Sequence, residues 1–540
     1  MGQAAWWQGA VIYQIYPASF QDSNGDGWGD LAGIEQRLDY VAELGADAIW
    51  LSPIFASPMR DFGYDASDYR RIDPRFGTMA DWQRLRDAAH ARGLKVLLDH
   101  ILGHTSTDHA WFQASRRRQE GKDDWYIWAD PKPDGTAPNN WLSVFGGTAW
   151  TWDALRRQYY LHDFHTTQAD LNFHHPEVQE QMLAEVAFWL EQGADGYRLD
   201  TVSHYFHDHA LHDNPPRAHE GAMPENPYAL QWHRYDKARD DNLDFLKRLR
   251  AVADRHGALL LGEVVCDDGI GLLGRYLEGG DKLHTGYVLE LPSGASTARA
   301  LCETIGRIAQ SCGEQWPSYA LSNHDVPRVV SRLMWSHPDA EPGYMPQMAK
   351  AMLVLLLSLR GVCLLYQGEE LGLPQAELPR EALRDPFTID FDLGVRGRDG
   401  ARTPMPWSSQ AHQGGFSSAA ATWLPMPATH LALAVDTQQG RDDAPLAVAR
   451  KLIALRKAHV ALREGTMAVS LAGERMMQIR RVHGAEVITS WVNLGPSRQE
   501  VPHAGAPLLL AGARQDTGRL ILEGWGAAVM CDGGGGGSHG

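Results

Sequence analysis

The stretch Ala194-Asp195-Gly196-Tyr197-Arg198-Leu199-Asp200-Thr201 organises the rest of this sequence. It follows an amphipathic run, residues 176–192, that ends at Gly193, where a helix is expected to stop. Apolar and charged residues then alternate, which predicts a short strand in which side chains two residues apart share a face. Arg198 and Asp200 should therefore lie on the same side of this strand.

Two opposite charges on one face of a buried strand are costly unless they pair or take part in chemistry. An arginine beside a carboxyl group lowers the pKa of that group and keeps it ionised, as a nucleophile requires. These residues alone are consistent with two interpretations. Arg198 and Asp200 could form a structural ion pair, or Asp200 could be a catalytic carboxylate.

Predicted strands and helices alternate along most of the chain, and their number favours a (β/α)₈ TIM barrel, an α/β fold. The predicted strands cover residues 11–16, 48–51, 95–99, 194–201, 258–263, 286–291, 318–322 and 362–366. The predicted helices cover residues 34–43, 79–91, 176–192, 243–256, 296–310, 345–360 and 445–458.

Two regions depart from this alternation and suggest further domains. Residues 105–172 are rich in Trp, Asp, Pro and Asn and show no clear period, which predicts a lobe inserted into a barrel built from residues 1–104 and 173–460. Residues 461–532 contain short alternating runs between turn residues, which predicts a C-terminal β-sandwich. Residues 533–540 are expected to form a flexible Gly-rich tail.

The composition argues against some classes of binding partner. A net charge of −17 disfavours nucleic acid and anionic membranes. The 5 cysteines have no CxxC spacing, so we expect a protein without disulfides. The N-terminus has no signal-peptide pattern and no apolar run is long enough to span a bilayer, so we expect a cytoplasmic protein. The 19 tryptophans suggest stacking platforms for sugars. For the oligomeric state, the sequence is consistent with a monomer or a homodimer.

Carboxylic acids follow several predicted barrel strands, at the end where such barrels carry out chemistry. Asp99, Asp200, Glu263 and Asp325 end the third, fourth, fifth and seventh strands. The apolar run before Glu263 should raise the pKa of that carboxyl, whereas Arg198 should keep Asp200 ionised. Two carboxyls with separated pKa values suit retaining glycoside hydrolysis, in which one is the nucleophile and the other the acid/base.

The chain resembles glycoside hydrolase family 13, the α-amylase family, and within it the α-glucosidase and oligo-1,6-glucosidase branch. The resemblance rests on eight stretches, in family order: residues 13–20, 61–65, 168–172, 196–200, 262–264, 323–325, 367–370 and 398–405. It implies a (β/α)₈ barrel enzyme that releases glucose from the non-reducing end of short α-glucosides through a covalent β-glucosyl-enzyme intermediate, with transglucosylation as a second outcome.

By this resemblance Asp200 is the nucleophile, Glu263 the acid/base and Asp325 the transition-state stabiliser. The resemblance also implies a glucosyl subsite whose residues are Asp61, Tyr64, His104, Arg198, Thr201, His324 and Arg398. Asp61 and Arg398 would pair to grip the sugar hydroxyls and close the pocket, which makes the enzyme exo-acting. Thr201 stands where enzymes that cut α-1,6 bonds usually have Val, so a preference for α-1,4 bonds is expected.

A metal site is expected near the N-terminus. The loop Asp22–Asp30 carries oxygen donors at positions one, three, five and nine, with glycine at six, as in a calcium loop. The predicted ligand residues are Asp22, Asn24, Asp26, Trp28 and Asp30. We predict a structural Ca²⁺, with Mg²⁺ as the alternative. A calcium site between barrel and lobe is not expected, because Gly103 stands where many family members have Asn.

Other functions stay open at this point. An oligo-1,6-glucosidase, or an isomerase-type glucosyl transferase acting on sucrose or trehalose, would use the same residues. A non-catalytic sugar-binding relative is disfavoured because Asp200, Glu263 and Asp325 are all present.

Overall fold

The computed structural model describes residues 5–221, 223–224, 226–338, 340–389 and 397–533. The expected tail lies outside these residues except for residue 533, which ends the last strand. No helix in the described part of the chain is both long enough and apolar enough to cross a bilayer.

Eight parallel strands form the central sheet, in the spatial order β13-β12-β11-β5-β2-β1-β15-β14. They are β1 Val11–Ile15, β2 Ala48–Leu51, β5 Lys95–His100, β11 Gly196–Leu199, β12 Leu259–Val264, β13 Thr285–Val288, β14 Ser318–Ala320 and β15 Val362–Tyr366. The two ends of this order, β13 and β14, also contact each other, so the sheet is a near-closed barrel, as predicted. Most of these strands are buried on both faces, as expected for parallel strands covered by helices.

Glycine is required where barrel strands come close together. Gly196 begins β11 with φ of 153°, and a Cβ atom there would lie 2.3 Å from the carbonyl oxygen of Leu259 on β12. A larger residue would push the two strands apart, and these strands carry Asp200 and Glu263.

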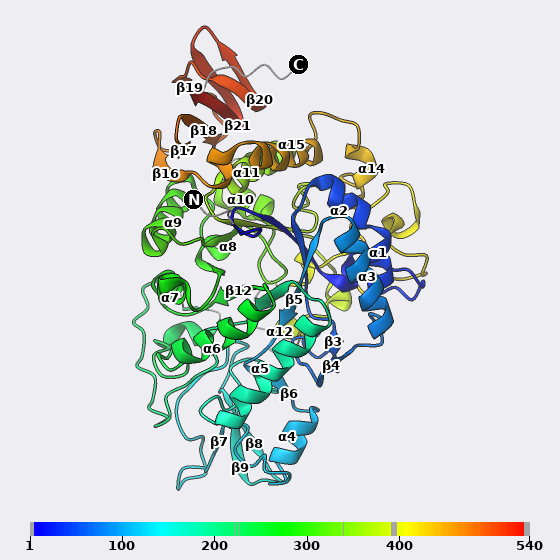
Figure 1. Ribbon diagram of the computed structural model, residues 1–540, viewed down its shortest axis with the longest axis vertical. Coiled ribbons are helices and arrows are strands. Elements are labelled where there is room, and N and C mark those ends of the chain that lie inside the picture. The colour runs from blue at the N-terminus through cyan, green and yellow to red at the C-terminus, as the bar shows by residue number, and fades with distance from the viewer. Residues whose placement is uncertain (1–4, 222, 225, 339, 390–396, 534–540) are drawn as a thin grey trace.

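Helices cover the outside of the barrel (Figure 1). The main ones are α1 Leu31–Gln36, α2 Leu38–Leu44, α3 Met79–Ala91, α5 Pro176–Glu191, α6 Asn242–Arg255, α7 Gly269–Leu277, α9 Ala298–Cys312, α11 Met345–Ser358 and α15 Pro445–Ala458. Shorter helices are α8 Glu290–Ser293, α10 Val329–Ser336, α12 Pro386–Ile389, α13 Ala428–Leu431, α14 Val435–Gln438 and α16 Val460–Arg463.

Some helices match the predicted bounds and others do not. Helices α3 and α15 have the predicted limits, and α3 begins with a capping box between Thr78 and Asp81. The predicted helix 34–43 is instead two helices, because the backbone of Arg37 is not helical. Helix α7 was not predicted, since three glycines interrupt its apolar pattern.

The inserted lobe is made of short elements. They are β6 His104–Ser106, α4 Ala110–Ser115, β7 Trp128–Ala129, β8 Trp150–Asp153, β9 Gln158–Leu161 and β10 Gln168–Asp170, with the nearby hairpin β3 Phe55–Ala56 and β4 Asp68–Ile72. Strands β7, β8 and β9 form a small antiparallel sheet, and β6 pairs with β10. Figure 1 shows this lobe and the C-terminal domain at opposite ends of the molecule.

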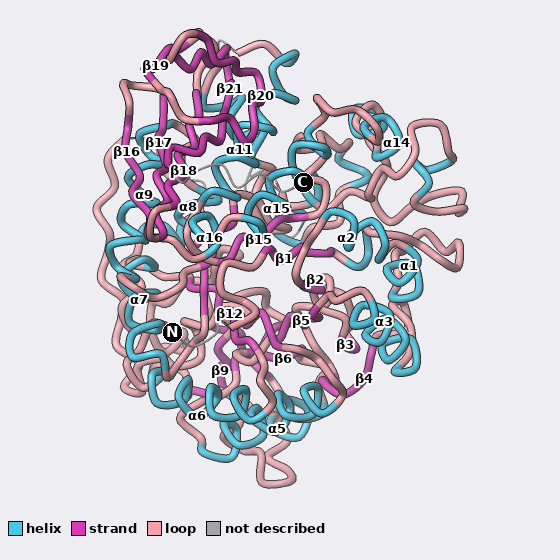
Figure 2. The backbone as a smooth tube through the Cα atoms, turned by 45° about the horizontal axis from the view of Figure 1, so that its top comes forward, coloured by secondary structure: helices cyan, strands magenta, loops and turns pink. Residues whose placement is uncertain are grey.

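The C-terminal strands form one antiparallel sheet of 6 strands, separate from the barrel strands in Figure 2. They are β16 Thr466–Leu471, β17 Met476–His483, β18 Glu486–Asn493, β19 Gln499–Pro502, β20 Ala506–Asp516 and β21 Arg519–Gly533. This sheet packs against α11, in which residues 351–358 are all buried and all but the last are apolar. A helix that is apolar all round needs such cover on both sides.

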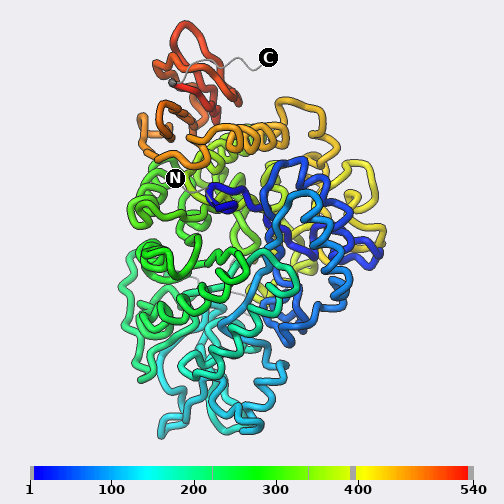
Figure 3. Tube along the Cα trace, viewed as in Figure 1, coloured from blue at the N-terminus to red at the C-terminus, as the bar shows by residue number. Residues whose placement is uncertain are grey.

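The N-terminal segment lies against loops that follow the last barrel strand, as the blue and yellow tubes in Figure 3 show. The amide of Met405 donates to the carbonyl of Ser19 at 2.8 Å, and the amide of Trp423 donates to Gly27 at 3.0 Å. The Asp22–Asp30 loop is therefore held between distant parts of the sequence.

Candidate active site

The barrel strands bring the predicted acids to one pocket. Asp200 follows β11, Glu263 lies near the end of β12 and Asp325 follows β14. The pocket has a volume of about 500 Å³. Its lining includes eight of the predicted residues, namely Asp61, Tyr64, His104, Asp200, Thr201, Glu263, Asp325 and Arg398. The other two predicted site residues, Arg198 and His324, are fully buried and contact residues of this lining.

A single guanidinium joins the carboxyls of three neighbouring strands. Arg198 Nη1 donates to Asp99 at 2.8 Å and to Asp200 at 2.7 Å, and Nη2 lies 2.6 Å from Glu263 Oε2. Its Nε and Nη2 also donate to the hydroxyl of Tyr287, at 3.2 and 3.1 Å. Arg198 thus fixes the relative positions of the two predicted catalytic carboxyls.

The electrostatics differ from the sequence-based expectation for Asp200. Burial raises the pKa of Asp200 and of Glu263, and Arg198 opposes the shift at both groups. Burial also raises the pKa of Asp99, to about 7. The expectation that Arg198 would hold the pKa of Asp200 below its usual value was wrong, because Asp200 is buried and the one positive charge faces three buried carboxyls. Full ionisation would leave negative charge uncompensated, and this favours a proton shared among the three carboxyls.

Tyr64 and His324 connect this group to Asp325. The Tyr64 hydroxyl donates to Asp99 at 2.9 Å and lies 2.6 Å from His324 Nε2, and the two rings stack. The Gln14 amide lies 2.8 Å from His324 Nδ1 and can donate to it, which places the histidine proton on Nε2, 2.9 Å from Asp325 Oδ2. Burial lowers the pKa of His324, so this histidine is neutral.

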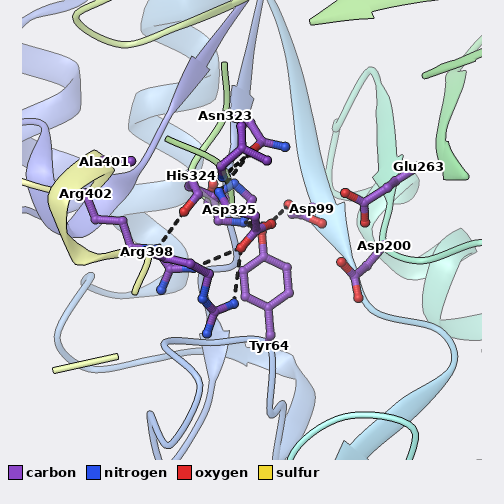
Figure 4. A network of polar contacts seen from close by, with 12 residues as sticks. Tyr64, Asp99, Asp200, Glu263, Asn323, His324, Asp325, Arg398, Ala401 and Arg402 are labelled. Carbon is purple, nitrogen blue, oxygen red and sulfur yellow. Dashed lines mark hydrogen bonds and ion pairs between the residues drawn. The ribbon is translucent and has the colours of Figure 1, made fainter. Parts of the chain in front are cut away.

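Asp325 is the most strongly ionised of the predicted catalytic acids. Its Oδ1 accepts from Arg398 at 3.1 Å and from Arg402 at 2.9 Å. Burial opposes ionisation, but His324, Arg398 and Arg402 outweigh it and hold the pKa of this carboxyl well below its usual range. Figure 4 shows Asp200 and Glu263 on one side of the Tyr64 ring and the two arginines on the other.

Arg398 closes one side of the pocket. It donates to Asp61 at 2.7 Å, as predicted, and to Asp385 at 2.8 Å. Burial would raise the pKa of Asp385, but Arg398 outweighs this and lowers it to about 2. Met59 and Phe62, on either side of Asp61, have positive φ angles of 60° and 50°. Such strained backbone is typical of sites where a side chain must be held in one place.

The lobe contributes one wall of the pocket. His104 Nε2 lies 2.9 Å from the carbonyl oxygen of Tyr64 and 3.3 Å from the side-chain nitrogen of Gln168. The ring of Phe164 packs against His104 with centroids 5.2 Å apart. Burial lowers the pKa of His104 to about 4, so it is a neutral hydrogen-bonding group.

Thr201 has an unusual conformation beside Asp200. Its φ angle is 39°, which is rare for a β-branched residue. Its hydroxyl donates to Asp200 Oδ2 at 3.3 Å, and its amide donates to Glu263 Oε2 at 3.2 Å. Thr201 therefore contacts both predicted catalytic carboxyls and also lines the pocket.

Much of the remaining pocket wall is apolar. Among the described residues it includes Val144, Phe145, Phe164, Val265, Leu289, Val326, Pro327 and Phe387, and no tryptophan. The expected tryptophan platforms are therefore absent from this described wall. Many tryptophans, including Trp50, Trp82 and Trp189, are instead fully buried. Phenylalanines provide the aromatic surface that sugars can contact.

Sequence reasoning missed several residues of this network, among them Tyr287 and Asp385. Tyr287 lies in a mainly apolar predicted strand, and Asp385 lies in a loop without periodicity. The register of β12 and β13, which pairs Glu263 with Tyr287, would have identified the tyrosine. Nothing in the sequence near Asp385 indicates that Arg398 is its partner.

The predicted metal loop is away from the pocket lining and is held together by its own side chains. Asp22 accepts from the amides of Asn24, Gly25 and Gly27 at 2.7–2.9 Å. Asp26 accepts from the Trp28 amide at 2.8 Å. Among the described residues, no group of three or more His, Cys, Asp or Glu is arranged to hold a metal ion. The all-oxygen donor set suits Ca²⁺ or Mg²⁺, and the bound ion stays a prediction.

Comparison with known proteins places the chain in a family. The family described as "Alpha amylase, catalytic domain" matches residues 14–465. The chain is 50% identical over 498 residues to a probable alpha-glucosidase of Rhizobium meliloti, covering 91% of this chain and 89% of that protein. It is 36% identical over 516 residues to Maltase A2 of Drosophila melanogaster, and this alignment covers 91% of this chain and 86% of that protein.

A solved structure agrees with these matches. The alpha-glucosyl transfer enzyme XgtA has a TM-score of 0.91 and 47% identity, and the alignment covers 98% of this chain and 100% of that one. Together with the barrel and the acids at its strand ends, these matches show that the chain belongs to the α-amylase family, glycoside hydrolase family 13.

Proposed function

We propose that this protein is a retaining, exo-acting α-glucosidase that removes glucose from the non-reducing end of short α-glucosides. One observation carries the proposal. Asp200 and Glu263 come from adjacent strands, both bind the guanidinium of Arg198, at 2.7 and 2.6 Å, and both line the same pocket. A retaining glycosidase requires two carboxyls held close together in this way.

In the first step Asp200 attacks the anomeric carbon while Glu263 gives its proton to the leaving oxygen. Arg198 and the Thr201 hydroxyl each donate to Asp200, on Oδ1 and Oδ2 respectively, and so orient it for attack. Burial raises the pKa of Glu263, which favours the protonated form that this step requires. Asp325, held ionised, stabilises the positive charge that develops on the sugar ring.

In the second step Glu263 acts as a base and removes a proton from water, which releases glucose from Asp200 with its configuration retained. The contacts of Arg398 with Asp61, Asp325 and Asp385 occupy one side of the pocket. A longer chain could not continue past this side, and therefore only the terminal glucosyl unit would be cut.

The proposal is tested by Asp200→Asn and Glu263→Gln, with Asp244→Asn on the exposed face of α6 as the control. Each catalytic variant should lose at least ~10²–10⁴-fold in kcat on maltose while remaining folded. Proton NMR of the first glucose formed should show the α anomer. Near-normal activity of either variant, or β-glucose as the first product, would contradict the proposal.

The apolar wall of the pocket favours a second outcome, glucosyl transfer. Phe145, Phe164 and Phe387 can hold a second sugar where water would otherwise enter. The similarity to an alpha-glucosyl transfer enzyme supports this proposal. With p-nitrophenyl α-glucoside, nitrophenol release should exceed glucose release, and the gap should widen as substrate concentration rises. Equal release at all concentrations would show hydrolysis alone.

A further inference from the structure

Tyr287 is a buried tyrosine behind the predicted acid/base. It lies on β13 directly beside Glu263 of β12 in the strand register, and only 1% of its surface is exposed. Its hydroxyl donates to Glu263 Oε1 at 3.0 Å. Tyr287 does not line the pocket, so it acts on the reaction only through other residues.

The direction of this hydrogen bond is fixed by Arg198. The Tyr287 oxygen accepts from Arg198 Nε at 3.2 Å and from Nη2 at 3.1 Å. A guanidinium can only donate, so it occupies the acceptor sites of the phenol oxygen. The phenol hydrogen is thereby left to point at Glu263.

The two oxygens of Glu263 have unequal surroundings. Oε2 faces two donors, Arg198 Nη2 at 2.6 Å and the Thr201 amide at 3.2 Å. Oε1 has one such partner in the described structure, Tyr287. A proton on Oε2 would displace one of its donors, whereas a proton on Oε1 can use the lone pair that Tyr287 leaves open.

We infer that Tyr287 is a positioning residue that makes Oε1 the proton-carrying oxygen of Glu263 and stabilises the anionic form needed in the second step. This inference rests on the proposed function. In the acid form Oε1 keeps the hydrogen bond from Tyr287 and directs its proton elsewhere. In the base form the same phenol stabilises the carboxylate.

Loss of the phenol hydroxyl should therefore shift the titration of Glu263. Besides Tyr287, the charged or titratable groups that act most strongly on Glu263 are Arg198, Asp200, His324 and Asp325, and Tyr287→Phe leaves all four in place. The anion loses a donor, so the pKa of Glu263 rises. The alkaline limb of the kcat/KM profile should move up by roughly 0.5–1 pH unit.

The second step should also slow, because Glu263 is then a less well-oriented base. For an aryl glucoside with a good leaving group, the second step limits turnover, and kcat should fall about tenfold with a parallel fall in KM. The control is Tyr197→Phe on β11, which removes an equally buried hydroxyl that bonds the backbone oxygen of Val186. The Tyr197→Phe control should change neither the alkaline limb of the kcat/KM profile nor the KM.

An opposite change gives a second measurement. Site-specific 3-fluorotyrosine at position 287 makes the phenol a stronger donor and should move the alkaline limb down. Opposite shifts for 3-fluorotyrosine and Phe support the inference, and unchanged limbs in both overturn it. If Tyr287→Phe does not fold, the fluorotyrosine shift alone decides. Full activity of Glu263→Gln would instead overturn the proposed function, so the two failures are distinguishable.

Discussion

At the scale of single residues, the chemistry of the pocket depends on one arginine. Arg198 is fully buried and contacts the carboxyls of Asp99, Asp200 and Glu263. Its removal would leave three acids close together in a site of low dielectric, where their charges repel strongly. For this reason Arg198 cannot be replaced by a neutral residue without also changing the protonation of its neighbours.

Thr201 offers a test of linkage preference. Thr201→Val removes the hydroxyl that donates to Asp200 but keeps a branched side chain, so the strain of the 39° φ angle is similar in both. We expect the wild type to cut maltose faster than isomaltose, and the valine variant to shift the ratio of kcat/KM values toward isomaltose by ~1–3 kcal/mol.

Thr201→Ser is the matched control, because it keeps the hydroxyl and should retain a ratio close to that of the wild type. A wild-type preference for isomaltose, or a ratio that does not change in Thr201→Val, would show that this side chain does not determine the linkage.

Glu369 provides a pH-dependent test of stability. Burial raises the pKa of this carboxyl from 4.5 to about 8, and its Oε1 accepts no hydrogen bond among the described residues. Between these values the unfolded chain ionises while the folded protein keeps the proton, so stability falls as pH rises. Glu369→Gln removes this penalty and should stabilise the protein by roughly 1–3 kcal/mol at pH 7, and by little near pH 4.5.

The measurement is the free energy of unfolding of both proteins from pH 4.5 to 8. Glu377→Gln, at an exposed position, is the control and should give parallel curves. A constant difference between wild type and Glu369→Gln across this range would mean that Glu369 is ionised in the folded protein.

At the scale of elements, the Asp22–Asp30 loop is the part whose stability should depend on a metal ion. It ends where Asp30 caps α1 by accepting from the amide of Gly33 at 2.7 Å. Because a ligand that binds only the folded state stabilises it, a chelator should lower the melting temperature, and Ca²⁺ or Mg²⁺ should restore it. Calorimetry with each ion would identify which one binds.

Asp26→Ala is the matched variant for this loop, because Asp26 is exposed and its replacement disturbs little packing. It should melt at the temperature of the chelated wild type and should not respond to the chelator. Identical melting curves of the wild type with and without chelator would exclude a stabilising ion here.

At the scale of the whole molecule, α11 joins the barrel to the C-terminal sheet. It packs against β18, β20 and β21, and the Ser358 hydroxyl bonds that of Ser490 at 2.7 Å. Buried Arg481 donates to the carbonyl of Ser358 at 2.9 Å. A chain ending at residue 464 would expose the apolar face of α11, so we expect it to aggregate, since large exposed apolar patches associate.

The control for this truncation is a chain ending at residue 533, which keeps all 6 strands of the sheet. It should be as soluble as the full chain and melt at the same temperature in one cooperative transition. A chain ending at residue 464 that stays soluble with unchanged glucosidase activity would show that the barrel folds without the sheet.

The sequence by itself determined where the barrel strands lie along the chain and which acids follow them. The strands 48–51 and 362–366 and the helices 79–91 and 445–458 have the predicted limits, because apolar period, caps and glycine stops are local signals. The glycines in α7 and the non-helical Arg37 were misread, since packing against neighbours overrode local preference there.

Only the tertiary structure decided which charges meet. Asp61 and Arg398 are 337 residues apart in the chain yet 2.7 Å apart in space, and Asp385 joins them without any local signal. The protonation of Asp200 likewise depends on the burial and on every charge around Arg198, not on the arginine two residues away alone. Periodicity is a property of neighbours in sequence, whereas a pKa is a property of neighbours in space, and only the folded chain fixes the latter.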